Sequence, residues 1–145
     1  MRFVCSSLAF VGRILICLIF ISAAVNKLTH WDQNAQYMAT KGMTNIPVLL
    51  ILAMITEFVG GLSLLLGYKP RLGALLLFLF LIPATIIFHN FWEVPSPERE
   101  LQTIMFFKNL AIMGGLLYIM AFGPGSCAID GCCDKRGDID NPKSC

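Results

Sequence analysis

Four long runs of apolar residues, separated by short polar stretches, organise the chain. They span about residues 4–28, 46–67, 72–91 and 101–122. Each run is close to the roughly 20 residues that a helix needs to cross the apolar core of a bilayer. Because backbone polar groups inside a bilayer must be satisfied within the segment itself, the pattern predicts an all-α fold, a bundle of four transmembrane helices.

The polar stretches carry signals for interfaces and helix starts. The stretch 30–45 holds Trp31 and Tyr37, whose rings favour the membrane–water interface. Part of this stretch is predicted to form a short interfacial helix. A Ser-Pro-Glu motif that begins at Ser96 predicts the start of the helix leading into the fourth run, with serine as its cap and proline in its first turn.

Glycine and proline inside the runs predict helix geometry. Gly60 and Gly61 remove side-chain bulk, which allows a neighbouring helix to approach closely. Pro83 removes a backbone donor from the third run and predicts a kink there. The hydroxyl of Thr85 can help to satisfy the carbonyl that Pro83 leaves free at Leu79.

The first run also resembles a secretory signal, with Arg2 before it and the small residues Ser22, Ala23 and Ala24 near its end. Arg13 interrupts the apolar core that such a signal needs. No polar start of a mature chain follows the run. A retained membrane helix is therefore favoured over a cleaved signal.

The composition is that of a membrane protein. Of 145 residues, 57% are hydrophobic and 14% are charged, whereas about 25% charged residues are typical of soluble domains. The mean hydropathy is +0.72. We expect one transmembrane domain, residues 1–125, followed by a short cysteine-rich tail, residues 126–145. A net charge of +2, with no basic run interleaved with aromatic residues, argues against nucleic-acid binding.

The distribution of lysine and arginine predicts the orientation of the bundle. Lys41 and Arg99 lie in the connections on one side. The basic residues expected on the other side are Arg2, Lys69, Arg71, Lys135, Arg136 and Lys143. By the positive-inside rule, both termini and the turn at Lys69 face the cytoplasm, and the expected location is a bacterial inner (plasma) membrane.

One half of the predicted bundle collects polar side chains. Glu57 falls near the middle of the second run, where a charged side chain costs about 2.5–3.5 kcal/mol or more. The other three helices place polar groups toward the same, outward-facing half. The predicted binding cluster consists of Lys27, Glu57, His89, Asn90, Lys108 and Asn109.

Within this cluster, Glu57 is expected to pair with Lys108. Counting from the helix starts places the two residues at similar depths, roughly 15 and 12 Å. Such a pair can be a structural staple, or part of a site that binds something polar. Lys27 is expected to act as an interfacial anchor, and His89 either as a satisfied interface residue or as a proton carrier. The asparagines can serve simply as hydrogen bonds between helices.

The chemistry of the cluster limits what it can bind. Its side chains donate and accept hydrogen bonds, which suits a quinone head group or a small anion. The sequence contains no phosphate-binding loop, no zinc motif of helix-borne His and Glu, and no nucleophile–base arrangement. No catalytic residue is assigned.

Several short motifs, in this order and spacing, resemble the DoxX family over nearly the whole hydrophobic chain. The matching residues are Arg13, Lys27 and Leu28 in the first run, Gly42 before the second, Glu57, Gly60, Gly61, Leu65, Leu66 and Gly67 in the second, Arg71, His89, Phe91 and Trp92 around the third, and Phe107, Lys108, Asn109, Leu110, Gly114, Gly115, Gly123, Pro124 and Gly125 in and after the fourth.

The resemblance implies a four-helix membrane bundle with a link to membrane redox complexes, including small subunits of thiosulfate:quinone oxidoreductase and quinol oxidase assemblies. It implies an accessory or oxidoreductase subunit that lies in the lipid bilayer and contacts quinone and a redox partner subunit. Two other classes stay open: a small transporter or permeation protein, and a non-catalytic scaffold for a partner protein. An oligomer is compatible with each of these.

The tail departs from the family pattern by its cysteines. Asp130 is kept, whereas Cys127, Cys132, Cys133 and Cys145 are added. Their spacing is not a standard zinc or iron–sulfur pattern, so no metal site is assigned. The alternatives are no defined role, redox thiols, a soft-metal site at Cys127, Cys132 and Cys133, or acylation. On the cytoplasmic side these thiols are expected to be reduced.

The predicted orientation can be tested by labelling. A cysteine placed in the stretch 31–45 should react with an impermeant maleimide on intact cells, because this stretch is expected to face outward. The native tail cysteines should react only after the cells are opened. Labelling is read as a mass shift of the purified protein, and the reverse pattern would contradict cytoplasmic termini.

Overall fold

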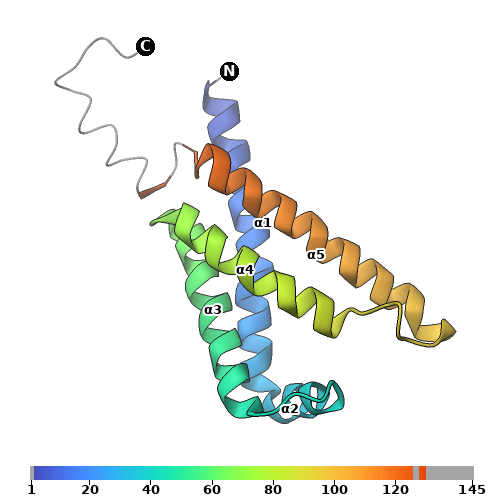
Figure 1. The fold of residues 1–145 in the computed structure, drawn as a ribbon. Helices are drawn as coiled ribbons and strands as arrows, with labels where there is room; N and C mark the ends of the chain where they lie inside the picture. The colour runs from blue at the N-terminus through green and yellow to red at the C-terminus, as the bar shows by residue number, and fades with distance from the viewer. Residues whose placement is uncertain (1, 126–127, 130–145) are drawn as a thin grey trace.

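The computed structural model describes residues 2–125 and 128–129 and, within them, shows only helices as regular structure (Figure 1). The helices are α1 (Arg2–Thr29), α2 (Trp31–Thr40), α3 (Ile46–Leu66), α4 (Pro70–Phe88) and α5 (Ser96–Phe122). All except α2 are long and apolar enough to cross a membrane. The predicted all-α fold with four candidate membrane spans is confirmed, and the helix expected within the first polar stretch is α2.

The helices do not all pack against one another. α1 packs along α3, and α4 packs against both α3 and α5. Figure 1 shows α4 and α5 diverging from α1 and α3 toward the end where α2 lies. We call this half of the bundle the α2 half, and the opposite half, which contains the α3–α4 turn and the end of α5, the terminal half.

The hydrophobic core lies mainly in the terminal half. The core side chains, all almost completely buried, come from the four long helices. They are Cys17, Phe20, Leu64, Ala74, Leu77, Leu81, Leu116 and Ile119. Because these side chains fill the space between the helices there, the room for a ligand is in the α2 half.

Gly60 and Gly61 bring two helices onto opposite sides of α3. A methyl group added to Gly60 would come within 2.5 Å of the Leu77 side chain on α4. One added to Gly61 would come within 3.1 Å of Ile21 and 3.4 Å of Phe20 on α1. The predicted close approach at the paired glycines is therefore present on both sides.

The ends of two helices differ from the prediction, at positions where proline or histidine occurs. The third membrane helix runs from Pro70 to Phe88, rather than over 72–91. Proline suits its first turn because a residue there needs no intrahelical N–H bond. At the other end, His89 leaves helical geometry with φ −124° and ψ 41°. In α5, Ser96 is the first helical residue and Pro95 holds the cap position expected for the serine.

Arg13 lies inside the terminal half and is only 2% exposed. Its guanidinium lies 5.7 Å from the centre of the Phe10 ring. It also lies beside Gly67, which ends α3 with φ +66° and leaves no room for a side chain between Arg13 and Ala128. The interior of the terminal half therefore includes an arginine.

The close approach at Gly60 predicts a clear difference between two glycine substitutions. Gly60→Ala should destabilise the protein by about 1–3 kcal/mol, because Leu77 is fully buried and cannot move away freely. Gly114→Ala should be neutral or stabilising by up to about 1 kcal/mol, since nothing lies within 4 Å of the added methyl group. Thermal melts in detergent would measure both, and equal effects would contradict the packing at Gly60.

Candidate functional site

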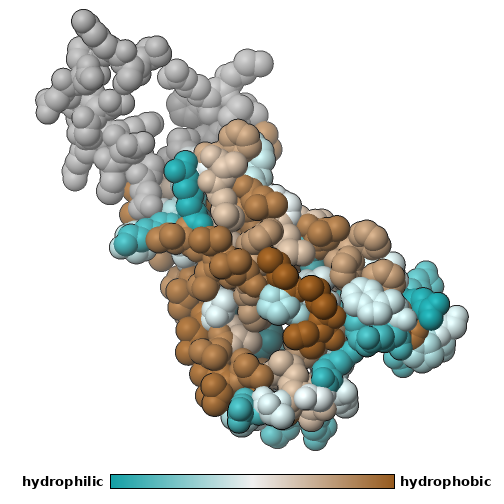
Figure 2. Space-filling view, in the orientation of Figure 1, coloured by the Kyte–Doolittle hydropathy of each residue, from teal (hydrophilic) through white to brown (hydrophobic). Residues whose placement is uncertain are grey.

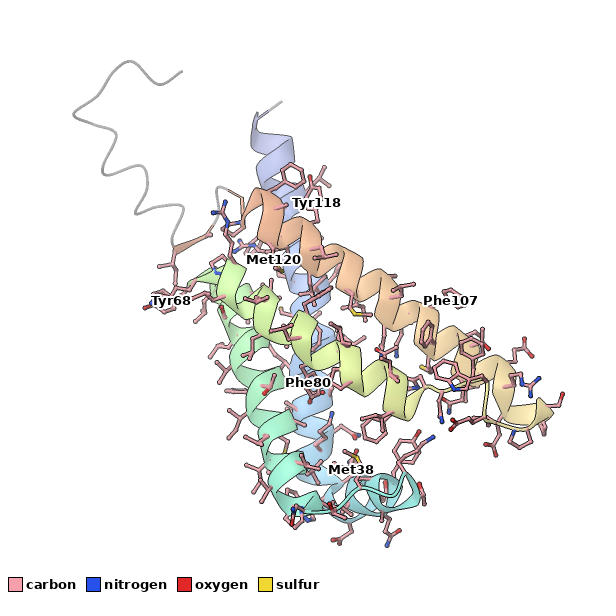
Figure 3. The ribbon with its side chains drawn as sticks, in the orientation of Figure 1. Met38, Tyr68, Phe80, Phe107, Tyr118 and Met120 are labelled. Atoms are coloured by element: carbon pink, nitrogen blue, oxygen red, sulfur yellow. The ribbon has the colours of Figure 1, made fainter. Side chains whose placement is uncertain are left out.

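A cavity of about 560 Å³ lies among the helices of the α2 half. Figure 2 shows a hollow in the molecule between α4 and α2, with apolar residues above it and polar residues of α2 below. In Figure 3, Met38 of α2 and Phe80 of α4 lie on opposite sides of this space. The apolar lining includes Ile19, Phe20 and Ala23 of α1, Met38 of α2, Leu49, Leu50 and Ala53 of α3, Phe80, Leu81 and Ile87 of α4, and Ile112 of α5.

Polar side chains interrupt this apolar lining at a few positions. They are Lys27, Asn34, Tyr37, Thr56, Glu57, His89, Lys108 and Asn109. Five of the six residues of the predicted cluster therefore line one cavity, and only Asn90 does not. A mainly apolar pocket with a few fixed polar groups is the usual form of a small-molecule site.

The strongest polar interaction in the cavity is an ion pair between α1 and α3. Lys27 Nζ donates to both carboxylate oxygens of Glu57, at 2.7 and 2.8 Å. The Glu57 side chain is 6% exposed and that of Lys27 is 21% exposed. Lys27 is thus more than the interfacial anchor expected from its place near the end of α1, because it neutralises the buried carboxylate.

The expected pairing of Glu57 with Lys108 is wrong. The two residues line the same cavity, but the carboxylate bonds to Lys27. The reason is helix packing: α3 packs along α1, whereas α5 packs mainly on α4. Equal depth in the membrane did not make α3 and α5 neighbours.

Asn109 joins α5 to α4. Its Nδ2 donates to the Thr85 hydroxyl at 3.1 Å, and both residues are buried. Thr85 was expected only to relieve the backbone beside Pro83, so its place in the polar network was missed. The sequence could have indicated this bond, because the Thr85 hydroxyl and the Asn109 amide have similar predicted depths in the membrane.

His89 and Asn90 have different surroundings although they are adjacent. His89 lines the cavity, and its Nδ1 lies 2.9 Å from Oε1 of Gln102 on α5. Asn90 lies outside the lining. Its Oδ1 accepts from Lys41 Nζ at 2.9 Å, and its Nδ2 donates to Glu93. Asn90 therefore fixes the loop after α4 rather than contributing to the cavity wall.

Two contacts hold α2 against the end of α4. The Tyr37 ring stacks on Phe88 with 5.6 Å between centroids, and its hydroxyl donates to the Phe88 carbonyl at 3.1 Å. Burial raises the pKa of the Tyr37 hydroxyl, which is the donor in this contact. The second contact is the bond from Lys41 to Asn90. The sequence predicted Tyr37 at the membrane–water interface. It did not predict that Tyr37 lines the cavity or that Lys41 bonds to Asn90.

Lys108 is an exposed lysine that also lines the cavity. Its Nζ donates to the thioether sulfur of Met105 at 3.1 Å, a weak acceptor. In the part of the chain that the structure describes, no carboxylate lies within ion-pair distance of it. The cavity thus contains one neutralised lysine and one with a weak partner.

Among the side chains that the structure describes, those of residues 8–125 and 128–129, no three of His, Cys, Asp or Glu come together as a metal site would require. Cys127, Cys132 and Cys133 lie outside the described residues. The cavity presents two ammonium groups, a carboxylate, two amides and an imidazole within a mainly apolar lining.

The ion pair predicts an asymmetric double-mutant cycle. Lys27→Met should destabilise the protein by about 3–5 kcal/mol, because it leaves the buried Glu57 charge uncompensated. Glu57→Gln should cost less, since Lys27 is the more exposed partner. The double variant should recover much of the loss, giving a large coupling term in thermal melts.

The matched control for this cycle combines Glu57→Gln with Lys108→Met. These two changes should be additive within about 0.5 kcal/mol, because the two side chains are not bonded to each other. Additivity in the Lys27 cycle, or strong coupling in the Lys108 cycle, would contradict the observed pairing.

Comparison with known proteins identifies relatives over most of the chain. Inner membrane protein YqjF of Escherichia coli (strain K12) is 36% identical over 127 residues, which cover 87% of this chain and 92% of that protein. Inner membrane protein YphA of the same organism is 29% identical, over 85% of this chain and 88% of that protein. No solved structure matches the chain.

A eukaryotic relative matches a shorter region. The Surfeit locus protein 4 homolog of Schizosaccharomyces pombe is 38% identical over 82 residues, which are 55% of this chain and 27% of that protein. The sequence pattern of the DoxX family matches residues 8–90, which hold α2, α3, α4 and most of α1. This match covers more than half of the chain and includes Lys27, Glu57 and His89. The chain is therefore an integral membrane protein that belongs to the DoxX family.

Proposed function

We propose that the protein is an accessory subunit of a membrane redox system, in a bacterial inner membrane, and binds a quinone head group in the cavity of the α2 half. The observation that carries the proposal is the cavity itself. It is an apolar space of about 560 Å³ within the membrane-spanning bundle, and its polar groups include the Lys27–Glu57 pair. A lipid-soluble ligand with one polar end fits such a space.

The donors available in the cavity suit the carbonyl oxygens of a quinone. An ammonium group has three N–H bonds. Lys27 uses two of them on Glu57, so that one N–H is left to donate to a carbonyl. Lys108 uses one on Met105 and has two left. Apolar side chains of the wall can contact the ring and the isoprenoid tail.

The packing of the bundle favours a one-sided binding site over a permeation path. In the terminal half, Leu64, Leu77 and Leu116 are fully buried and close the space between the helices. A transporter would need a second state in which this core opens. The redox part of the proposal is supported by the family resemblance, whereas the names of the bacterial relatives support the inner-membrane location.

Analysis of co-purified lipids tests the proposal. The full-length protein, purified in mild detergent, should carry quinone that mass spectrometry of the extracted lipids detects. The double variant Lys27→Met with Glu57→Gln should lose quinone about tenfold or more, because it removes the Lys27 donor and the carboxylate that holds this donor in place.

The control is a second double variant that removes the same kinds of charge outside the cavity. Arg99→Met with Glu98→Gln changes the start of α5, and neither residue lines the cavity. This control should keep its quinone. An equal loss in both variants, or no quinone in the natural protein, would contradict the proposal. Uptake of a solute into vesicles in place of quinone binding would favour the transporter alternative.

A further inference from the structure

The cavity has a positive charge that the described residues do not balance. Its charged side chains are Lys27, Glu57 and Lys108. Lys27 and Glu57 neutralise each other through two hydrogen bonds. Lys108 is left with one bond to a thioether, which carries no charge. The sum over these three groups is therefore one positive charge.

Such a charge favours an anionic ligand. Lys108 lies within the membrane-spanning helix α5, one residue before the buried Asn109. Intramembrane lysines are costly unless they pair with an anion or reach water, and they commonly mark ligand sites. A hydrogen bond from this ammonium to a carboxylate or phosphate is assisted by charge on both partners and is stronger than one between neutral groups.

The shape of the lining adds a second requirement. Most of the cavity wall is apolar, and the polar groups occupy a minor part of it. A small anion such as acetate or chloride would satisfy Lys108 and leave this wall without contacts. A ligand that uses both features carries one negative charge at the end of an apolar chain.

We infer that the cavity binds a long-chain carboxylate, with its carboxylate on Lys108 and its chain against the apolar wall between α3 and α4. Asn109 holds α5 in place beside this site through its bond to Thr85. Lys27 stays on Glu57, so that this pair contributes no net attraction for the anion. This binding property requires no redox role and goes beyond the quinone proposal.

Native mass spectrometry of the full-length protein in neutral detergent tests the inference, with palmitate and its methyl ester as probes at mildly alkaline pH. Palmitate should bind the natural protein at least about tenfold more tightly than the uncharged ester, because only the acid pairs with Lys108. This comparison needs no variant, so it stands even where a substitution prevents folding.

Three variants locate the charge. Lys108→Met should weaken palmitate binding about tenfold or more, and Lys108→Arg should keep most of it, because the positive charge is preserved. Arg99→Met removes a charge from the same helix outside the cavity and should leave binding unchanged. Equal binding of acid and ester, or full binding by Lys108→Met, would overturn the inference.

The remaining outcomes distinguish this inference from a small-anion site and from the quinone proposal. Displacement of palmitate by equimolar acetate would show a site for small anions and overturn the chain-binding part. Quinone measured in the same spectra distinguishes the two proposals. Palmitate binding without quinone would contradict the proposed function alone, and quinone without charge-dependent palmitate binding would contradict this inference alone.

Discussion

The ion pair between Lys27 and Glu57 is the constraint on which the rest of the bundle depends. A charged side chain near the middle of a membrane helix costs about 2.5–3.5 kcal/mol on insertion scales. Two hydrogen bonds from Lys27 compensate the buried carboxylate. The pair fixes the register of α1 against α3, and the glycines one turn further, Gly60 and Gly61, allow α4 and α1 to pack closely on either side.

With α1, α3 and α4 held in this way, the place of α5 decides the shape of the site. α5 packs mainly on α4 and diverges from α1 and α3 toward the α2 half (Figure 1). The terminal half is consequently filled by core side chains and the α2 half contains a cavity. A bundle with four helices in regular contact would have closed this space.

The apolar runs were sufficient to predict the fold, because a bilayer allows few alternatives to helices of about 20 residues. They also placed Lys27, Glu57, His89, Lys108 and Asn109 in one half, where the structure finds them around one cavity. The partner of Glu57 could not be predicted. Depth along a helix is a one-dimensional quantity, whereas the choice between two lysines depends on which helix packs beside α3.

The contacts between α2 and the end of α4 could not be predicted from the sequence for a related reason. Tyr37 and Lys41 lie in a polar stretch whose path over the bundle depends on tertiary packing. α5 packs on α4, and the bond from Asn109 to Thr85 contributes to this packing. Lys108, the residue before Asn109, is therefore not bonded to Glu57, whose partner is Lys27. Were α5 packed on α3 instead, the two lysines would compete for one carboxylate and the cavity between them would close. The separation of the two lysines, and with it the unbalanced charge, follows from the packing of α5 on α4, to which the buried Asn109 contributes.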